Sequence, residues 1–483
     1  MKRLRTLADT VLQPGFVGTK PPDWVRRRLA EGLGGVALFA RNVVDADQLA
    51  ALTAALRTEK PDVIVAIDEE AGDVTRLYAR TGSPWPGNLA LGEIDDPALT
   101  EDVAFRLGGE LAAAGITLDY APDADVNSDP NNPVIGARAF GADPDLVSRH
   151  TVAWIKGLQR AGVAAAAKHF PGHGNTSVDS HLDVPVIKAS RAELDAVELA
   201  PFRAAIDAGV LAIMSAHLRV PALDPDLPAT LSPRIMTELL RDELGFTGLV
   251  VTDGIEMRAI SDRFGLEHAT VLALVAGNDA ICIGGDHADE PTAARLRDAI
   301  AAAVCRGELS EERLADAAAR VERVAQATRR PDRPAVRPQP HTSDEAGLAA
   351  ARRAVRVTGA EPALRTAQVI EFQPVLSFAV APETPWGVGA PLAARLPGTT
   401  WTRVVENEPL PALDGRPLVL VVRDAHRYPW VLDAVAELLA ARPDAIVVEM
   451  GIPMAVLGAT HLATYGATTV AGRAAAERLA GTP

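Results

Sequence analysis

One stretch of the chain, residues 168–181, concentrates side chains that can exchange protons: three histidines, one aspartate and one lysine. It follows the apolar run 163–167 directly, and Pro171, Gly172 and Gly174 interrupt any regular structure within it. Because proline and glycine favour turns, the chain must leave a strand here and display polar side chains in a loop. We expect the chemistry of the protein in this loop.

Asp179 and His181 stand two residues apart in this loop. A carboxylate that accepts one imidazole N–H fixes the tautomer and leaves the other nitrogen available for proton transfer. The alternative is a local turn made by Asp179 with an exposed histidine beside it.

Asp253 ends the apolar run 249–252 and precedes Gly254. A carboxylate held at a strand end between apolar walls can serve as a nucleophile or a base. An N-cap for the following helix explains the same residue equally well.

Four further residues are candidates for binding a polar substrate. Neighbouring residues of a strand point to opposite faces, so one of Lys168 and His169 should donate to a substrate hydroxyl while the other packs. Asp68 is suited to accept hydrogen bonds from sugar hydroxyls and Arg138 to donate one. For Arg138 considered alone, a salt bridge is the favoured interpretation.

The histidine density also suggests a metal site formed by His169, His173, His181, His217 and Asp179. No H-E-x-x-H or C-x-x-C spacing supports such a site, so we expect neither a metal nor a cofactor.

Short apolar runs alternate with capped amphipathic segments over the first 330 residues. Asp45, Asp143 and Ser190 each precede a predicted helix as N-caps. Eight of the runs are predicted strands: 11–17, 35–39, 63–67, 116–120, 163–168, 211–215, 249–252 and 280–283. This alternation predicts a (β/α)8 barrel of the TIM type.

The placement of polar residues supports the barrel, because the carboxyl ends of its strands converge on one face, where active sites are built. The residues at or just past predicted strand ends are Asp68, Asp119, Lys168, His169, His217 and Asp253. A doubly wound sheet is the alternative, but its glycine fingerprint is absent from the sequence.

A proline-rich segment, 329–340, reads as a stiff linker. Beyond it, the runs 367–372, 418–422 and 445–449 predict buried parallel strands, with a helix over 430–440. We therefore predict a catalytic barrel at 1–330, a linker at 331–345 and a smaller layered α/β domain, similar to an αβα sandwich, at 346–483.

The composition of the 483 residues is that of a globular protein, with 48% hydrophobic and 23% charged residues. A net charge of −15 disfavours nucleic acid and anionic membranes as partners. With two cysteines, no signal peptide and no membrane span, we expect a cytoplasmic protein. The oligomeric state is left open.

In combination, these motifs resemble glycoside hydrolase family 3, and within it the bacterial β-N-acetylglucosaminidases. The resemblance runs from about Gly15 to Arg323. It is carried by the segments 168–181, 67–70, 136–141, 214–217 and 252–257.

The resemblance implies a role for each residue. Asp253 aligns with the nucleophile that forms a covalent glycosyl-enzyme, and His181, assisted by Asp179, aligns with the acid/base. The residues implied in binding the terminal sugar are Asp68, Arg138, Lys168 and His169, with Arg76 and His217 as further candidates.

Two departures from the family pattern stand out. Asp73 stands where an arginine is usual, so a guanidinium expected near the pocket is lost, although Arg76 is kept. Gly254 stands where this branch often has aspartate or alanine.

We therefore expect a retaining exo-β-N-acetylglucosaminidase, a β-N-acetylhexosaminidase acting on short glycans such as cell-wall turnover fragments. Few aromatic residues, 4% of the chain, favour a pocket over a long cleft. The alternatives are a β-glucosidase or a β-N-acetylglucosaminide phosphorylase of the same family, a metal-dependent hydrolase, and a non-catalytic sugar-binding protein.

Overall fold

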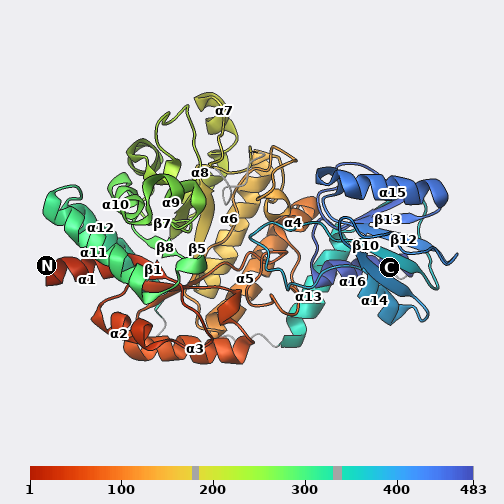
Figure 1. The fold of residues 1–483 in the computed structure, drawn as a ribbon, viewed down its shortest axis with the longest axis horizontal. Coiled ribbons are helices and arrows are strands. Elements are labelled where there is room, and N and C mark those ends of the chain that lie inside the picture. The colour runs from red at the N-terminus through yellow and green to blue at the C-terminus, as the bar shows by residue number, and fades with distance from the viewer. Residues whose placement is uncertain (177–183, 330–339, 482–483) are drawn as a thin grey trace. The chain divides into compact units, whose positions relative to one another are not determined.

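The computed structural model describes residues 1–176, 184–329 and 340–481 (Figure 1). The chain divides into two compact units. The first unit contains Met1–Glu69, Thr100–Ile135 and Ala142–Pro338, and the second contains Glu70–Leu99, Gly136–Gly141 and Gln339–Pro483. The predicted acid/base pair, Asp179 and His181, lies outside the described residues.

The first unit is an α/β fold built on a curled parallel sheet. Its strands are β1 (Leu12–Pro14), β2 (Gly35–Leu38), β3 (Ile64–Ile67), β4 (Leu118–Asp119), β5 (Ala164–Phe170), β6 (Ala212–Ser215), β7 (Leu249–Thr252) and β8 (Ile281–Ile283). Strands β2 to β7 are hydrogen-bonded in chain order, and β1 pairs in parallel with β8. A bridge between Val251 and Ala280 joins β7 to the start of β8. Each predicted strand overlaps one of these eight.

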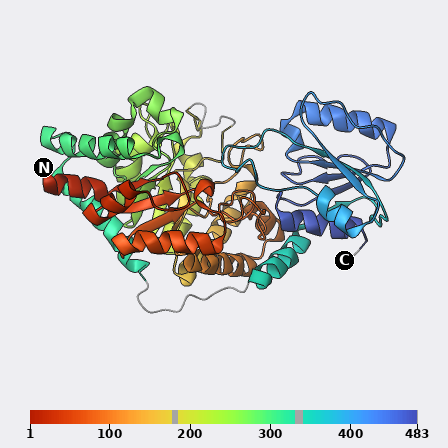
Figure 2. The same cartoon turned by 60° about the horizontal axis from the view of Figure 1, so that its bottom comes forward.

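Helices follow the strands of this unit along the chain. They are α1 (Lys2–Thr10), α2 (Asp23–Glu31), α3 (Ala46–Glu59), α5 (Pro97–Ala113), α6 (Pro144–Ala161), α7 (Arg191–Ala196), α8 (Ala200–Asp207), α9 (Arg258–Phe264), α10 (Leu266–Ala276), α11 (Glu290–Arg306) and α12 (Glu311–Ala327), with a π-helix at Arg234–Glu243 and single 3₁₀ turns at Ala40–Asn42, Ala229–Leu231 and Gly285–His287. The N-caps predicted at Asp45, Asp143 and Ser190 are confirmed, since each side chain accepts a backbone N–H of the first turn. Helix α1 packs against α11 and α12 (Figure 2).

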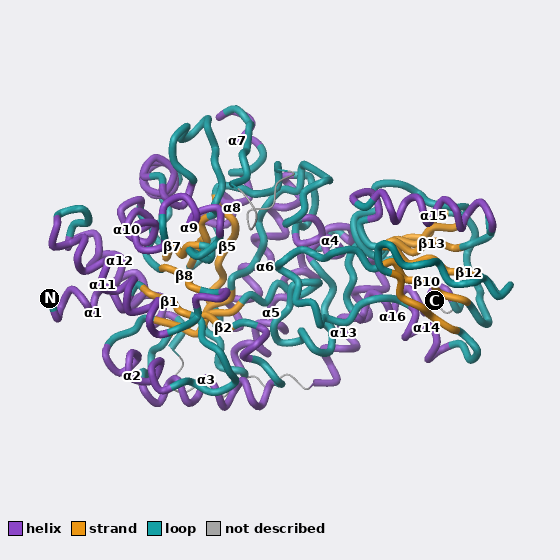
Figure 3. Tube along the Cα trace, in the orientation of Figure 1, coloured by secondary structure: helices purple, strands orange, loops and turns teal. Residues whose placement is uncertain are grey.

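Alternate residues of the strands form one apolar cluster inside the curled sheet, around which the helices lie (Figure 3). The cluster includes Ala66 of β3, Ala166 of β5 and Val251 of β7. Because side chains alternate along a strand, the residues two positions further on keep the same orientation. Asp68 and Asp253 directly follow β3 and β7, and Lys168 lies in the last part of β5, so all three belong to the carboxyl-terminal side of the sheet.

The second unit contains a six-stranded sheet in the order β11-β10-β12-β13-β14-β9. Its strands are β9 (Arg356–Thr358), β10 (Gln368–Phe372), β11 (Thr400–Val404), β12 (Leu418–Val422), β13 (Ile446–Glu449) and β14 (Thr460–Ala463), and only the β9–β14 pair is antiparallel. Its helices are α4 (Asn88–Ile94), α13 (Pro340–Ala354), α14 (Gly389–Arg395), α15 (Pro429–Ala441) and α16 (Thr469–Leu479), with 3₁₀ turns at Gly136–Arg138 and Ala425–Arg427.

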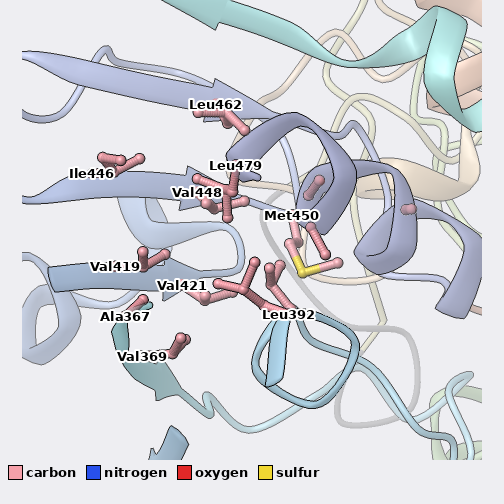
Figure 4. Packing of buried hydrophobic residues seen from close by; sticks show 14 of the residues in the cluster. Ala367, Val369, Leu392, Val419, Val421, Ile446, Val448, Met450, Leu462 and Leu479 are labelled. Atoms are coloured by element: carbon pink, nitrogen blue, oxygen red, sulfur yellow. The ribbon is translucent and has the colours of Figure 1, made fainter. Parts of the chain in front are cut away.

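Both faces of this sheet are buried, which is typical of parallel sheets covered by helices. One apolar cluster joins Val421 and Val448 to Leu392 of α14 and Leu479 of α16 (Figure 4). A second cluster joins the alternate residues of the same strands to α15. The three apolar strands predicted here, β10, β12 and β13, are therefore confirmed.

Two segments that come early in the chain fold with the C-terminal residues rather than with the strands they follow. Thr469 donates a hydrogen bond from Oγ1 to the carbonyl of Ser83 at 2.8 Å. A side chain at Gly347 would lie 1.7 Å from the carbonyl oxygen of Pro84, so the two backbones are in direct contact. The second unit thus includes the loop between β3 and α5.

No helix among the described ranges combines the length and the apolar character that crossing a bilayer requires.

Gly174 gives a test of how the 168–176 segment is held. An added Cβ at this position would lie 1.7 Å from the carbonyl oxygen of Val126. We expect Gly174→Ala to lower the free energy of unfolding by about 2 kcal/mol or more, because a backbone atom must move to admit the methyl group. Urea denaturation measures this. Gly466→Ala is the control, since its Cβ would have no neighbour closer than 4.0 Å; equal losses in the two variants would contradict the close approach.

Candidate active site

Asp68 and Lys168 form an ion pair at the carboxyl ends of β3 and β5. The Lys168 Nζ atom donates to Asp68 Oδ1 at 2.7 Å. The lysine side chain is only 1% exposed, whereas that of Asp68 is 21% exposed. The carboxylate is thus held in place from below and keeps an accessible side for a ligand.

His169 is oriented by a fully buried carboxylate, that of Asp125. The Nδ1 atom of His169 lies 2.7 Å from Asp125 Oδ2. The other oxygen, Oδ1, accepts the backbone N–H groups of His169 and His173 at 3.3 and 2.6 Å. Because a carboxylate only accepts, the Nδ1 atom of His169 donates this hydrogen bond.

Burial alone would raise the pKa of the Asp125 carboxyl, but His169 and the hydrogen bonds outweigh it and hold that pKa below its usual value. The carboxylate is therefore ionised at neutral pH. It fixes both halves of the Lys168–His173 segment from one point.

Asp253 is held through its own backbone and that of Gly254. Its N–H donates to the carbonyl of Ser215 on β6 at 3.1 Å. The Nε2 atom of His217 lies 2.9 Å from the carbonyl oxygen of Gly254, which can only accept, so Nε2 donates. Helix α9 is capped by Met257 rather than by Asp253. The N-cap alternative for Asp253 is therefore wrong.

Glu256 is an acid that the sequence analysis did not single out. Its Oε1 accepts the N–H of Gly284 at 2.8 Å. Its Oε2 is inaccessible to solvent and accepts no hydrogen bond from the residues the structure describes. Burial, and next to it the charge of Asp253, raise the pKa of Glu256 to about 7. The only sequence signal was its position three residues after Asp253.

The carboxylates at the carboxyl ends of these strands raise the pKa values of nearby buried groups. Burial and then the charges of Glu256, Asp68 and Asp253 raise the pKa of the Cys282 thiol well above its usual value. Asp119, which is fully buried, also has a raised pKa because of burial and the neighbouring acid Glu69. The charges of Asp68 and Asp253, which follow β3 and β7, therefore both act on Cys282 of β8.

Arg138 and Arg76 belong to the second unit. Arg138 forms a two-point salt bridge with Glu70, with Nε–Oε2 and Nη2–Oε1 distances of 2.8 Å each. Arg76 donates from Nη1 to the carbonyl of Ala379 at 2.8 Å. The salt bridge expected of Arg138 is thus present.

One group of described residues has the composition of a cation site: Asp123, Asp125 and His169. The predicted ligand His217 lies elsewhere, with Nδ1 2.9 Å from Thr230 Oγ1. Within this group, the Nδ1 atom of His169 is already engaged in a hydrogen bond to Asp125.

Sequence reasoning missed Asp125 because acids after a strand are common. The available signal in the sequence was the alternation of Asp123, Asp125 and Asn127 directly after Pro122. In the structure the bond before Pro122 is cis. Alternation in an extended segment places its polar residues on one face.

Carboxylates and a buried lysine at the carboxyl ends of parallel strands define an enzyme site for a polar substrate. The family model for the N-terminal domain of glycosyl hydrolase family 3 matches residues 7–324. The chain belongs to glycoside hydrolase family 3.

Curated relatives match about half of the chain. A protein named beta-hexosaminidase A from Pseudoalteromonas piscicida is 38% identical over 282 residues, which are 54% of this chain and 47% of that protein. The beta-hexosaminidase of Alkalilimnicola ehrlichii is 37% identical over 279 residues, 56% of this chain and 80% of that protein. The chain thus spans about half the length of the first and four fifths of the second.

Solved structures match over nearly the whole chain. A glycoside hydrolase family 3 beta-N-acetylglucosaminidase from Paenibacillus sp. superimposes with a TM-score of 0.89 and 32% identity, covering 99% of this chain and 96% of that one. A structure described as beta-glucoside phosphorylase BglX has a TM-score of 0.81 at 20% identity, covering 99% and 92%, which supports the fold alone.

The raised pKa of Glu256 predicts a pH dependence of stability. The folded chain holds this proton up to about pH 7, whereas the usual pKa of a glutamate is 4.5. Between these values the folded state binds more protons than the unfolded state, so the contribution of Glu256 falls as pH rises, by at most about 3 kcal/mol. Glu256→Gln should remove this loss.

Urea midpoints at pH 5, 6, 7 and 8 measure it: the wild type should lose stability relative to Glu256→Gln as pH rises. Glu267→Gln is the control, because Glu267 pairs with Arg295 at the surface and has a lowered pKa. Parallel curves for wild type and Glu256→Gln would refute the prediction.

Proposed function

We propose that the chain is a retaining exo-β-N-acetylglucosaminidase that removes terminal β-linked N-acetylglucosamine from short glycans. The observation that carries the proposal is the Asp253 carboxylate, which directly follows β7, is not the N-cap of α9, and acts together with Asp68 in raising the pKa of Cys282. The names of the relatives support the same substrate class.

In the proposed reaction, Asp253 attacks the anomeric carbon and the bond to the leaving oxygen breaks. His181, assisted by Asp179, gives that oxygen a proton. The covalent glycosyl-enzyme then reacts with a water whose proton His181 accepts, and the configuration is retained after two displacements. An unperturbed imidazole pKa near 6.5 suits both steps at neutral pH.

The remaining candidates are proposed to hold the terminal sugar. Asp68 accepts from a sugar hydroxyl, while Lys168 and His169 donate to or accept from neighbouring ones. Arg138, oriented by Glu70, donates a further hydrogen bond. His217 contributes indirectly, because its bond to the Gly254 carbonyl steadies the peptide that follows Asp253.

Arg76 is proposed to act at the edge of the site. Because Arg76 donates to the carbonyl of Ala379, its proposed role there is mainly structural.

We also propose that the first unit is a complete (β/α)8 barrel and that the C-terminal sheet with its helices is an αβα sandwich. The proposed boundaries are 1–330 for the catalytic domain, 331–345 for the linker and 346–483 for the C-terminal domain. The proposed location is the cytoplasm, and the proposed biological substrates are cell-wall turnover fragments. No metal or cofactor takes part in the proposed mechanism.

Asp253→Ala tests the nucleophile. The wild type should release nitrophenol from the β-N-acetylglucosaminide far faster than from the β-glucoside, and the variant should lose a factor of about 10³ or more in kcat. Asp262→Ala is the matched control, because Asp262 lies exposed on the next helix and pairs with Arg258 at the surface.

The assay is run with and without added phosphate and with a chelator. Rates unaffected by both additions would agree with hydrolysis without a metal. Turnover that rises with phosphate would favour a phosphorylase, and no turnover of either sugar by folded protein would leave a sugar-binding protein as the better explanation.

His181→Gln tests the acid through the leaving group. Nitrophenolate leaves without a proton, whereas the alcohol of a sugar requires one. We expect kcat/KM for N,N′-diacetylchitobiose to fall at least about tenfold more than kcat/KM for the nitrophenyl substrate. Asp179→Asn should show the same pattern to a smaller degree. An equal loss on both substrates would remove His181 from the role of acid.

A further inference from the structure

Asp73, where the resemblance predicts an arginine, is bound on both oxygens by the C-terminal part of the chain. Its Oδ2 accepts from Arg423 Nη2 at 2.7 Å, and its Oδ1 accepts the N–H of Ala467 at 2.8 Å. The two side chains of the ion pair are 10% and 8% exposed. Arg423 directly follows β12, 350 residues further along the chain. Position 73 thus carries a carboxylate that is paired with a guanidinium from the end of β12.

Asp73 lies in a tight turn, residues 70–74, which these contacts hold in place. The N–H of Glu70 donates to the carbonyl of Val74 at 3.1 Å and closes the turn. Ala71 and Gly72 have φ values of 57° and 59°, in the left-handed region that alanine rarely adopts. Such a backbone persists only where the surroundings determine it, and the paired Asp73 is one such determinant.

The same turn begins with Glu70, which orients Arg138. The two-point geometry between their side chains fixes the plane of the guanidinium as well as its position. Arg138 is 9% exposed and Glu70 3%. Asn88 donates from Nδ2 to the Arg138 carbonyl at 2.6 Å and holds its backbone. A shift of the turn would therefore move the guanidinium.

We propose that Arg423 is a positioning residue for the sugar-binding Arg138, acting through Asp73 and the turn 70–74. This rests on the proposed function, because it assumes that Arg138 binds the substrate. It gives the C-terminal sheet a part in recognising the terminal sugar: the sheet supplies the charge that sets the turn on which Arg138 depends.

Arg403 offers a matched control on the same sheet. Its guanidinium also forms an ion pair with a buried carboxylate, that of Glu371, at 2.8 Å. Arg403 and Arg423 lie against the same ring, 5.0 and 5.8 Å from the centre of Trp386. Replacing Arg403, whose side chain is 31% exposed, removes an arginine–carboxylate pair of the same sheet without touching Asp73.

The experiment compares Arg423→Ala, Arg423→Lys and Arg403→Ala with nitrophenyl β-N-acetylglucosaminide, after thermal melting has shown each variant folded at the assay temperature. We expect Arg423→Ala to lower kcat/KM at least about tenfold, mainly through a higher KM, because a displaced binding group weakens substrate contacts. Arg423→Lys should retain most of kcat/KM, and Arg403→Ala should stay within about twofold of the wild type.

The effect should vanish when Arg138 is absent: in an Arg138→Ala background, Arg423→Ala should change kcat/KM by less than about twofold. If Arg423→Ala does not fold, Asp73→Asn replaces it, because the amide oxygen still accepts from Ala467 while the ion pair is lost. The same fall in kcat/KM, absent in the Arg138→Ala background, is then expected.

Three results overturn the inference while leaving the proposed function intact. They are an active wild type with an unchanged Arg423→Ala variant, an equal loss in Arg403→Ala, and a full additional loss on top of Arg138→Ala. A folded wild type without turnover would instead overturn the proposed function, and this inference with it.

Discussion

The site depends first on one buried carboxylate, that of Asp125. One of its oxygens accepts a hydrogen bond from Nδ1 of His169, and the other accepts two backbone N–H groups. A single side chain thus orients the imidazole ring and fixes the segment that follows it. An unpaired charge at such depth would be strongly unfavourable, and the three donors offset that cost. Removing any one of them would leave the others to satisfy a buried anion. The segment from Lys168 to His173 is therefore fixed by charge as much as by packing.

A second constraint is the crowding of acids at the carboxyl ends of the strands. Asp119 and Glu256 have raised pKa values, which for both begin with burial. Both shifts favour the protonated form of the acid, which lowers the repulsion that buried carboxylates exert on one another. Lys168 supplies the opposite charge for Asp68. In the proposed reaction, a negative charge kept on Asp253 would stabilise an oxocarbenium-like transition state.

The sequence predicted what repeats locally and missed what depends on distant partners. Strand runs and the caps at Asp45, Asp143 and Ser190 follow from periodicity and side-chain chemistry within a few residues, and they are confirmed. Strand β11 was missed because it is an exposed edge strand, with Trp401 44% exposed, and shows no buried apolar run. The partner of Asp73 was unpredictable, since nothing local to that residue indicates Arg423.

Gly254 shows how a departure from a family pattern can be a packing consequence. A Cβ at this position would lie 3.1 Å from Glu256 Oε1, and one at Gly284 would lie equally close to the same atom. The carboxyl of Glu256 thus occupies the space into which a side chain at 254 would extend. Glu256, three residues after Asp253, has its carboxyl next to the position where a side chain at 254 would begin. The glycine at 254 and the glutamate at 256 therefore depend on each other. A substitution at either position has to be judged together with the other.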